Sequence, residues 1–428
     1  MKKKIVNVVL LVMLAALCLG LLSSCNNSAS VNFFEYSRDD LGLIGKLVAL
    51  MHDWIGNYGW TVVVFTVFLK ILMLPLEFWQ RYSSRKSSLK MQRIQPLVEA
   101  IDKRYGANTQ RANEEKQKLY KKQGYSMASM CLPMIITMVV FFVMFGGLRS
   151  YSTYSSITSF QRLSEVYHET FVEQILDDQD VKTQILGDSK MKPHYDDYEA
   201  ALESKNAKDL LTAQTKLIGD ADDIDNAKCV TFRNNALVAV KEYYDSHHES
   251  WLWIQNVWQP DTWAPVMQEY NGNSFAGGGF KTSINMEDYP GNAQATYDRI
   301  RSAVLDGNGY NHKGGWNGLM ILPVLSIGLS FLSMFISQRL EKKNRKGEAV
   351  QQNQQQAATN KTMMIIMPLM MALFGFLYTG AFAIYMVVNY SISILTTLAL
   401  RVPVEKVVLK KLDKEESKNQ SSKASYMR

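Results

Sequence analysis

The sequence predicts an all-α membrane protein with five transmembrane helices, a cytoplasmic helical hairpin and a mainly helical extracytoplasmic insertion. Hydrophobic residues make up 47% of the 428 residues, and they are gathered into long blocks separated by polar segments. Such blocks are typical of membrane-spanning helices, because about 20 apolar residues cross the hydrocarbon core of a bilayer. The net charge of +7 is a sum of basic and acidic segments that lie apart in the sequence. We therefore expect the polar segments on two different sides of a membrane.

Residues 1–25 have the pattern of a lipoprotein-type signal peptide. Three lysines precede an apolar run from Ile5 to Leu22, and two serines then lead to Cys25. The run is short for a membrane span, and polar residues follow it at once. Cleavage would leave Cys25 as a diacylated first residue outside the membrane, where the modification would carry palmitate. An uncleaved anchor helix is the alternative. Residues 26–57 form an outer N-terminal segment, in which 41–55 mixes apolar and charged residues as an interfacial helix does.

Four apolar blocks follow, and the last is too long for one span. Since an α-helix rises about 1.5 Å per residue, the block from Met363 to Leu400 would reach almost twice the hydrocarbon thickness. Tyr378-Thr379-Gly380 near its middle offers a turn, which divides it into two helices. The predicted spans are 58–76, 131–148, 316–338, 363–378 and 381–400.

Positive charge in the connecting segments orients these spans. Residues 77–130 contain twelve Lys and Arg against five Asp and Glu, and the segments 339–362 and 401–428 are basic as well. Basic segments stay in the cytoplasm, so five spans and an outside N-terminus place all three on that side. Residues 149–315, which contain fifteen Lys and Arg against twenty-five Asp and Glu, are predicted to lie outside.

Each of the longer polar segments has its own predicted structure. Residues 77–124 read as two helices that meet near Tyr105-Gly106-Ala107-Asn108, where glycine and asparagine permit a reversal. The outer insertion contains predicted helices at 195–218 and 227–244, followed from Trp251 by a loop-rich stretch. Its tryptophans at 251, 253, 258 and 263 are expected to anchor that stretch at the membrane interface. The Ser- and Lys-rich end of the chain from Glu415 is expected to be flexible.

Lys70 is the residue that most strongly indicates a function. It lies within the apolar run of the first span, where a lysine costs about 2.5 to 3.5 kcal/mol unless it faces protein or water. The alternative is snorkelling, because the inner end of the span is only about 9 Å away by helix rise. No predicted span contains an obvious carboxylate to pair with it. We therefore expect an unpaired cation in a water-filled cavity.

Several segments together resemble the YidC family of membrane protein insertases, of the YidC/Oxa/Alb superfamily. These segments are Phe65–Leu76, Met91–Pro96, Lys103–Tyr105, Cys131–Met134, Trp251–Ile254 with Pro260-Asp261, and Tyr385 with Asn389. Their order along the chain is far more specific than any one of them, and the resemblance covers nearly all of the chain except about residues 150–245. It identifies a lipoprotein form with an enlarged extracytoplasmic insertion.

The resemblance implies a function and a set of site residues. Five helices would enclose a hydrophilic groove, in which Lys70 supplies the positive charge and Thr66, Thr137, Tyr385 and Asn389 contact the groove or the client. The chain would insert client proteins into the bacterial inner membrane and help them to fold. Four positions depart from the family pattern, which has arginine at Lys70, glutamine at Thr137 and proline at both Val139 and Thr379. Lysine keeps the charge but, unlike arginine, can lose its proton when buried.

The implied partners are nascent membrane-protein clients and membrane lipids, with the ribosome and the secretion translocon as further partners of the basic segments. No dedicated nucleic-acid site is expected. No catalytic residue, metal site or cofactor is predicted either, since the sequence contains no Gly-rich phosphate loop, HExxH or Gly-x-Ser-x-Gly motif. Two rival functions stay open at this point. One is a transporter or channel for an anionic solute, and the other is a membrane-anchored extracytoplasmic binding protein.

Overall fold

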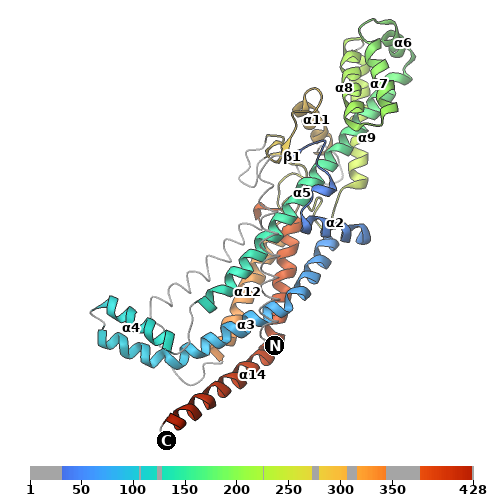
Figure 1. Ribbon diagram of the computed structural model, residues 1–428. Coiled ribbons are helices and arrows are strands. Elements are labelled where there is room, and N and C mark those ends of the chain that lie inside the picture. Colours follow the sequence, from blue (N-terminus) through green and yellow to red (C-terminus); the bar gives the residue numbers. More distant parts are fainter. Residues whose placement is uncertain are drawn as a thin grey trace. The chain divides into compact units, whose positions relative to one another are not determined.

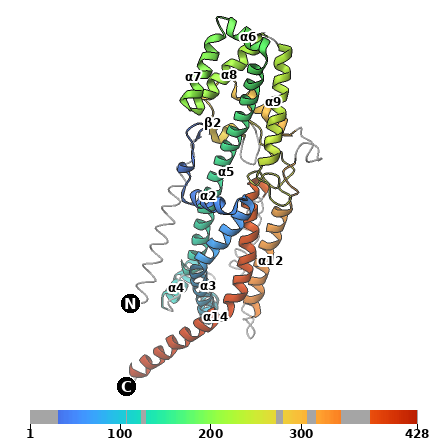
Figure 2. The same cartoon turned by 90° about the vertical axis from the view of Figure 1, so that its right-hand side faces the viewer.

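The computed structural model describes residues 31–105, 108–122, 128–224, 226–271, 279–305, 316–343 and 376–426. These residues are mostly helical, and they divide into two compact units (Figures 1 and 2). Unit 1 comprises Met1–Val63, Val143–Val324 and Ala372–Tyr385, whereas unit 2 comprises Val64–Phe142, Leu325–Met371 and Met386–Arg428. The four longest helices contribute to both units: α3 (Tyr58–Tyr105), α5 (Ala128–Asp177), α12 (Ile321–Lys343) and α14 (Gly380–Tyr426).

Unit 1 is built around the C-terminal part of α5. Beside it lie α6 (Gln179–Gly187), α7 (Lys192–Ser204), α8 (Ala207–Ile224) and α9 (Asn226–His247) (Figures 1 and 2). Their common core contains Phe160 and Phe171 of α5 and Val240 of α9. Tyr297 of α11 (Ala293–Leu305) is in the same core. The insertion therefore has a hydrophobic core of its own, which apolar burial stabilises at about 25 cal/mol per Å².

A short parallel sheet ties the N-terminal segment to this core. Strand β1 (Val31–Asn32) pairs with β2 (Ile284–Asn285), which directly follows α10 (Phe280–Ser283). After β1 comes a 3-10 helix, Arg38–Asp40, and then α2 (Leu43–Ile55). The predicted helix over 41–55 is therefore present as α2, and it ends at Gly56, whose positive φ of 72° suits glycine.

Buried polar residues fix the loop 251–261 to the starts of two helices in unit 1. Asp261 is fully buried, and its carboxylate accepts from the backbone N–H groups of Leu319, Met320 and Leu322 at 2.8–3.2 Å. Leu322 lies in the first turn of α12, where an N–H group has no partner inside the helix, and Leu319 and Met320 directly precede the helix. Asp261 therefore caps the start of α12 from a distance along the chain. The carbonyl of Gln259 similarly accepts from the N–H of Gly380 at the start of α14, at 2.8 Å.

The predicted membrane spans lie largely in unit 2, and each also includes residues of unit 1. Within the described residues, two helical stretches are long and apolar enough to cross a membrane, namely Tyr58–Lys90 of α3 and Gly380–Lys411 of α14. A shorter apolar stretch, Ile321–Ser337, belongs to α12. The predicted span 131–148 lies in the first part of α5, whereas residues 363–375 of the predicted fourth span are outside the described residues, as is the signal segment 1–25. The turn predicted at Tyr378-Thr379 is present, directly before α14.

The structure also describes both arms of the predicted hairpin. Helix α3 continues without a break from the first span to Tyr105, and α4 (Thr109–Lys122) runs after it. An ion pair of 2.5 Å joins Lys116 of α4 to Asp102 of α3. The two helices therefore end and begin on either side of the predicted reversal, of which residues 106–107 lie outside the described residues.

Two expectations were wrong. The helix predicted over 195–218 is broken at Lys205, whose positive φ of 53° ends α7 before α8 begins. Trp258 is not an interfacial anchor, because it is 3% exposed and its indole donates to the carboxylate of Glu249. The end of the chain, for which the sequence predicts flexibility, is helical in α14 through Tyr426.

Candidate functional site

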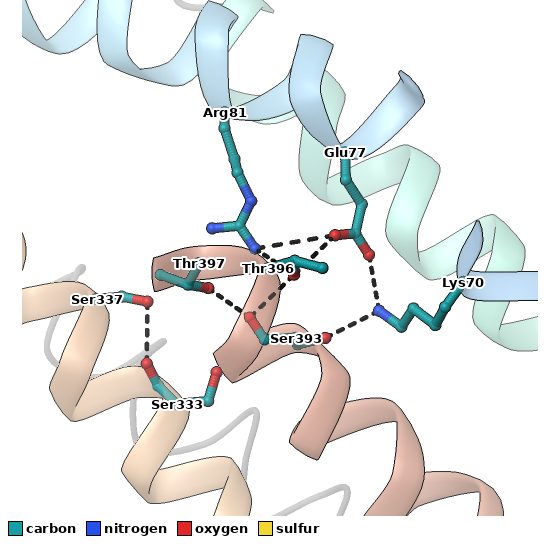
Figure 3. Close-up of polar contacts among 8 residues, drawn as sticks. All are labelled: Lys70, Glu77, Arg81, Ser333, Ser337, Ser393, Thr396 and Thr397. Carbon is teal, nitrogen blue, oxygen red and sulfur yellow. Dashed lines mark hydrogen bonds and ion pairs between the residues drawn. The ribbon is translucent and has the colours of Figure 1, made fainter. Parts of the chain in front are cut away.

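A cluster of charged and hydroxyl side chains joins α3 to α14 within unit 2. The Lys70 Nζ donates to Glu77 Oε1 at 2.7 Å and to Ser393 Oγ at 2.8 Å (Figure 3). Lys70 and Glu77 both belong to α3, whereas Ser393 belongs to α14. The lysine therefore holds a carboxylate of its own helix and a hydroxyl of a second one.

The second oxygen of the same carboxylate faces further polar groups. Glu77 Oε2 accepts from the Thr396 hydroxyl at 3.2 Å and lies 3.9 Å from Arg81 Nη2. Arg81 Nη2 also lies 3.4 Å from the Thr396 oxygen. Glu77 is thus the centre of the cluster, with a cation on each side of it (Figure 3).

The cluster is mostly shielded from solvent by the protein itself. The side chains of Lys70 and Glu77 are 15% and 16% exposed, and that of Arg81 is 30% exposed. Charges in such a place attract each other more strongly than charges at an open surface, because water screens them less. With two cations and one carboxylate, the three side chains carry a net charge of +1.

Helical spacing explains how the sequence builds this cluster. Lys70 and Glu77 are seven residues apart, close to two turns, so they share one face of α3. Glu77 and Arg81 are four apart and are neighbours on that face. On α14, the hydroxyls of Thr396 and Thr397 also lie within hydrogen-bond distance of the Ser393 carbonyl, at 3.1 and 2.6 Å, as hydroxyls inside apolar helices commonly do.

The structure overturns the expectation of an unpaired Lys70. The prediction failed because hydropathy ended the first span at Leu76, which placed Glu77 in the aqueous segment. The helix in fact continues through that point, and Glu77 reaches back along it. Lys70 extends toward the C-terminal part of α3, the direction in which a snorkelling side chain would also point.

The other predicted groove residues lie at separate places on α3, α5 and α14. Thr66 is buried one turn before Lys70 on α3, and Asn389 lies one turn before Ser393 on α14. Tyr385 is buried in the part of α14 that belongs to unit 1. Thr137 lies on α5, and its side chain is outside the described part of the chain, as is Cys25. Lys70 is placed inside the polar cluster by its contacts with Glu77 and Ser393.

Sequence reasoning missed Glu77, Arg81, Ser393 and Thr396. Two signals could have found them. Glu77 and Arg81 lie seven and eleven residues after Lys70, spacings that place them on the same face of a helix. Ser393, Thr396 and Thr397 form a hydroxyl-rich turn in an otherwise apolar span.

Next to the cluster, the continuation of α14 lies against α3. Val404 and Val408 of α14 are buried against Phe78, Tyr82 and Leu89 of α3 and Leu400 of α14. At the edge of this contact, Arg85 pairs with Glu405 at 3.0 Å, and the Lys411 ammonium lies 4.7 Å from the centre of the Tyr82 ring. The segment after the last predicted span is therefore docked on α3 up to at least Lys411.

A cavity of about 290 Å³ lies elsewhere, in unit 1, between α5, α9 and the segment 256–268. None of the predicted site residues lines it. Burial raises the pKa of Glu249, at its wall, to about 7 although the Trp258 indole donates to it. Among the described residues, no group of three or more His, Cys, Asp and Glu side chains is placed to hold a metal ion.

Comparison with known proteins decides the family. The 60Kd inner membrane protein family matches residues 50–194 and 234–406, which is most of the chain and includes the whole polar cluster. The chain belongs to this family. The match omits residues 195–233, so α8 falls outside the part of the chain that matches the family.

Several curated relatives carry the printed name membrane protein insertase YidC. That of Caldanaerobacter subterraneus subsp. tengcongensis is 38% identical over 113 residues, which are 26% of this chain and 53% of the relative. That of Oleidesulfovibrio alaskensis is 36% identical over 97 residues, 23% of this chain and 17% of the relative. That of Nitratidesulfovibrio vulgaris is 31% identical over 131 residues, 30% of this chain and 23% of the relative. The chain thus spans about half the length of the first relative and under a quarter of the other two.

Proposed function

We propose that this protein inserts client proteins into the bacterial inner membrane and helps them to fold, with Lys70 as the charge that attracts acidic client residues. The observation that carries the proposal is a lysine within an apolar helix, held in a polar cluster, in a chain of the 60Kd inner membrane protein family. The printed name of the relatives, membrane protein insertase, supports it.

The proposed mechanism needs no nucleotide, metal or bond-making step. Five helices would enclose a hydrophilic groove, in which Thr66, Thr137, Tyr385 and Asn389 line the path or touch the client. The client's polar tail would enter the groove while its apolar segment moves out along the spans, chiefly the second and the fifth. Burial of that segment in lipid supplies about 25 cal/mol per Å². The membrane potential adds about 2.3 kcal/mol per transferred charge at 100 mV.

The proposal includes a topology and a set of partners. The N-terminus would lie outside, with Cys25 lipidated, and the C-terminus would lie in the cytoplasm. The basic segments 77–130 and 401–428 would then face the ribosome and the secretion translocon, to which positive charge can steer them. The insertion at 149–315 would lie outside the membrane.

Reconstitution into liposomes tests this function against its two rivals. An insertase integrates a small single-span client that is synthesised in the presence of the vesicles, as protease protection of its translocated tail would report. A channel or transporter instead passes a small anionic solute, and an anchored binding protein does neither. Solute flux without client integration would refute the proposal.

A further inference from the structure

The charge of Lys70 is already occupied in this structure. Its ammonium lies 2.7 Å from Glu77 Oε1, and both side chains are about 15% exposed. A client carboxylate cannot bind the same ammonium equally well while Glu77 remains there, because the two carboxylates would be adjacent like charges. Any acidic client residue must therefore compete with a resident one.

The cluster offers Glu77 a second place to go. Its other oxygen lies 3.9 Å from Arg81 Nη2 and accepts from the Thr396 hydroxyl at 3.2 Å. Arg81 is the next residue on the same helical face, and its guanidinium can take both carboxylate oxygens at once. A small rotation of the Glu77 side chain would thus move the carboxylate from the lysine toward the arginine (Figure 3).

Such an exchange keeps every charge paired. At rest, Lys70 and Arg81 share one carboxylate. With a client carboxylate bound, Lys70 holds the client and Arg81 holds Glu77, so two cations face two anions. The Thr396 and Ser393 hydroxyls stay within reach of both arrangements, since each already bonds one of the partners. No charge is left without an opposite charge in this poorly solvated site, where an unpaired charge would raise the free energy.

We propose that Glu77 is the resident counter-ion of Lys70 and sets how acidic a client must be to engage the site. A client carboxylate displaces Glu77 from Lys70, and Arg81 with Thr396 receives it. This inference rests on the proposed insertase function and adds a specificity-determining residue to it.

The test uses the full chain in liposomes and three versions of one client, whose translocated tails carry two, one or no acidic residues. With Glu77→Gln, the competitor is removed, so at limiting insertase the one-acid client should insert roughly three- to tenfold better than with the wild type. The client without acidic residues should not gain. Glu99→Gln, on the same helix but outside the cluster, is the matched control and should behave as the wild type.

Two further variants distinguish this role from a merely structural one. Lys70→Ala should abolish the dependence on client acidity, and Glu77→Gln should have no further effect in that background. Arg81→Gln removes the receiving site, so it should weaken insertion of acidic clients, an effect opposite in sign to that of Glu77→Gln. Arg81→Lys should restore insertion in part, because lysine keeps the charge but cannot take both carboxylate oxygens at once. If Glu77→Gln fails to fold, the comparison of Arg81→Gln with Arg81→Lys tests the inference by itself.

Several outcomes would overturn the inference. Equal loss of all three clients with Glu77→Gln would mean that the carboxylate only holds α3 to α14. The same gain in the Lys70→Ala background would mean that Glu77 does not act through Lys70. Arg81→Gln without effect on acidic clients would remove the exchange. Absence of any client insertion by the wild type would instead refute the proposed function itself.

Discussion

Asp261→Ala is expected to be the most damaging single change outside the polar cluster. The carboxylate is fully buried and accepts three backbone N–H groups at the start of α12, at 2.9, 3.2 and 2.8 Å. The Trp253 indole lies 3.3 Å from both of its oxygens. Each buried donor that loses its acceptor costs about 1–3 kcal/mol. Because water can enter the space that the carboxylate leaves, we expect a total loss of about 3–5 kcal/mol.

The loss should appear as a lower midpoint of thermal unfolding of the purified protein in detergent. Hydrogen exchange should also accelerate at the amides of Leu319, Met320 and Leu322. Asp261→Asn keeps one acceptor oxygen and should fall between the wild type and the alanine variant. Asp288→Ala is the matched control, since Asp288 is exposed and pairs with Lys208 at 3.4 Å, so its loss should leave the unfolding midpoint nearly unchanged. An unchanged midpoint and unchanged exchange with Asp261→Ala would refute the capping argument.

Three further changes follow from the structure. Burial raises the folded-state pKa of Glu249 from 4.5 to about 7, so the folded state binds more protons than the unfolded state between these values. The protein therefore loses about 3 kcal/mol of stability as pH rises through this range. Glu249→Gln should flatten this fall in melting curves taken from pH 5 to 8. Val408→Asp should undock the end of α14 from α3, because Val408 is fully buried there, and new protease cleavage beyond Leu400 should report it. Gly59→Ala should lower the melting temperature, since a Cβ there would lie 2.0 Å from the Trp251 ring, whereas Gly219→Ala, at an open helical position, should be neutral or slightly stabilising.

The sequence predicted those features that depend on local composition. Glycine, asparagine and the spacing of apolar residues predict three such features: the helix at 41–55, the reversal between Tyr105 and Thr109, and the turn before Gly380. Lys70 could be singled out because a charge within an apolar run is rare in any helix that crosses a membrane.

Side-chain contacts across several helical turns, and the burial of particular side chains, could not be predicted in the same way. Glu77 pairs with Lys70 across two helical turns, beyond the point where hydropathy ends the span. The sequence predicts Trp258 at the membrane interface because tryptophan is amphipathic. The same property lets its indole pack in a protein interior and donate to a buried carboxylate, as it does to Glu249. The helix breaks at Lys205 although no glycine or proline is present there. The signal in the sequence is Asn206, whose side chain accepts from the Lys208 N–H at 3.0 Å and so caps the next helix.

The central claim is that the chain inserts clients by means of the positive charge at Lys70. The most direct measurement is the fraction of an acidic-tailed, single-span client that becomes protease-protected in liposomes containing the wild type, Lys70→Arg, Lys70→Ala or Lys70→Glu, against empty liposomes. We expect Lys70→Arg to insert as the wild type does, and Lys70→Ala and Lys70→Glu to insert at least roughly tenfold less, which corresponds to about 1.4 kcal/mol. Equal insertion by all four proteins, or by none above empty liposomes, would contradict the claim.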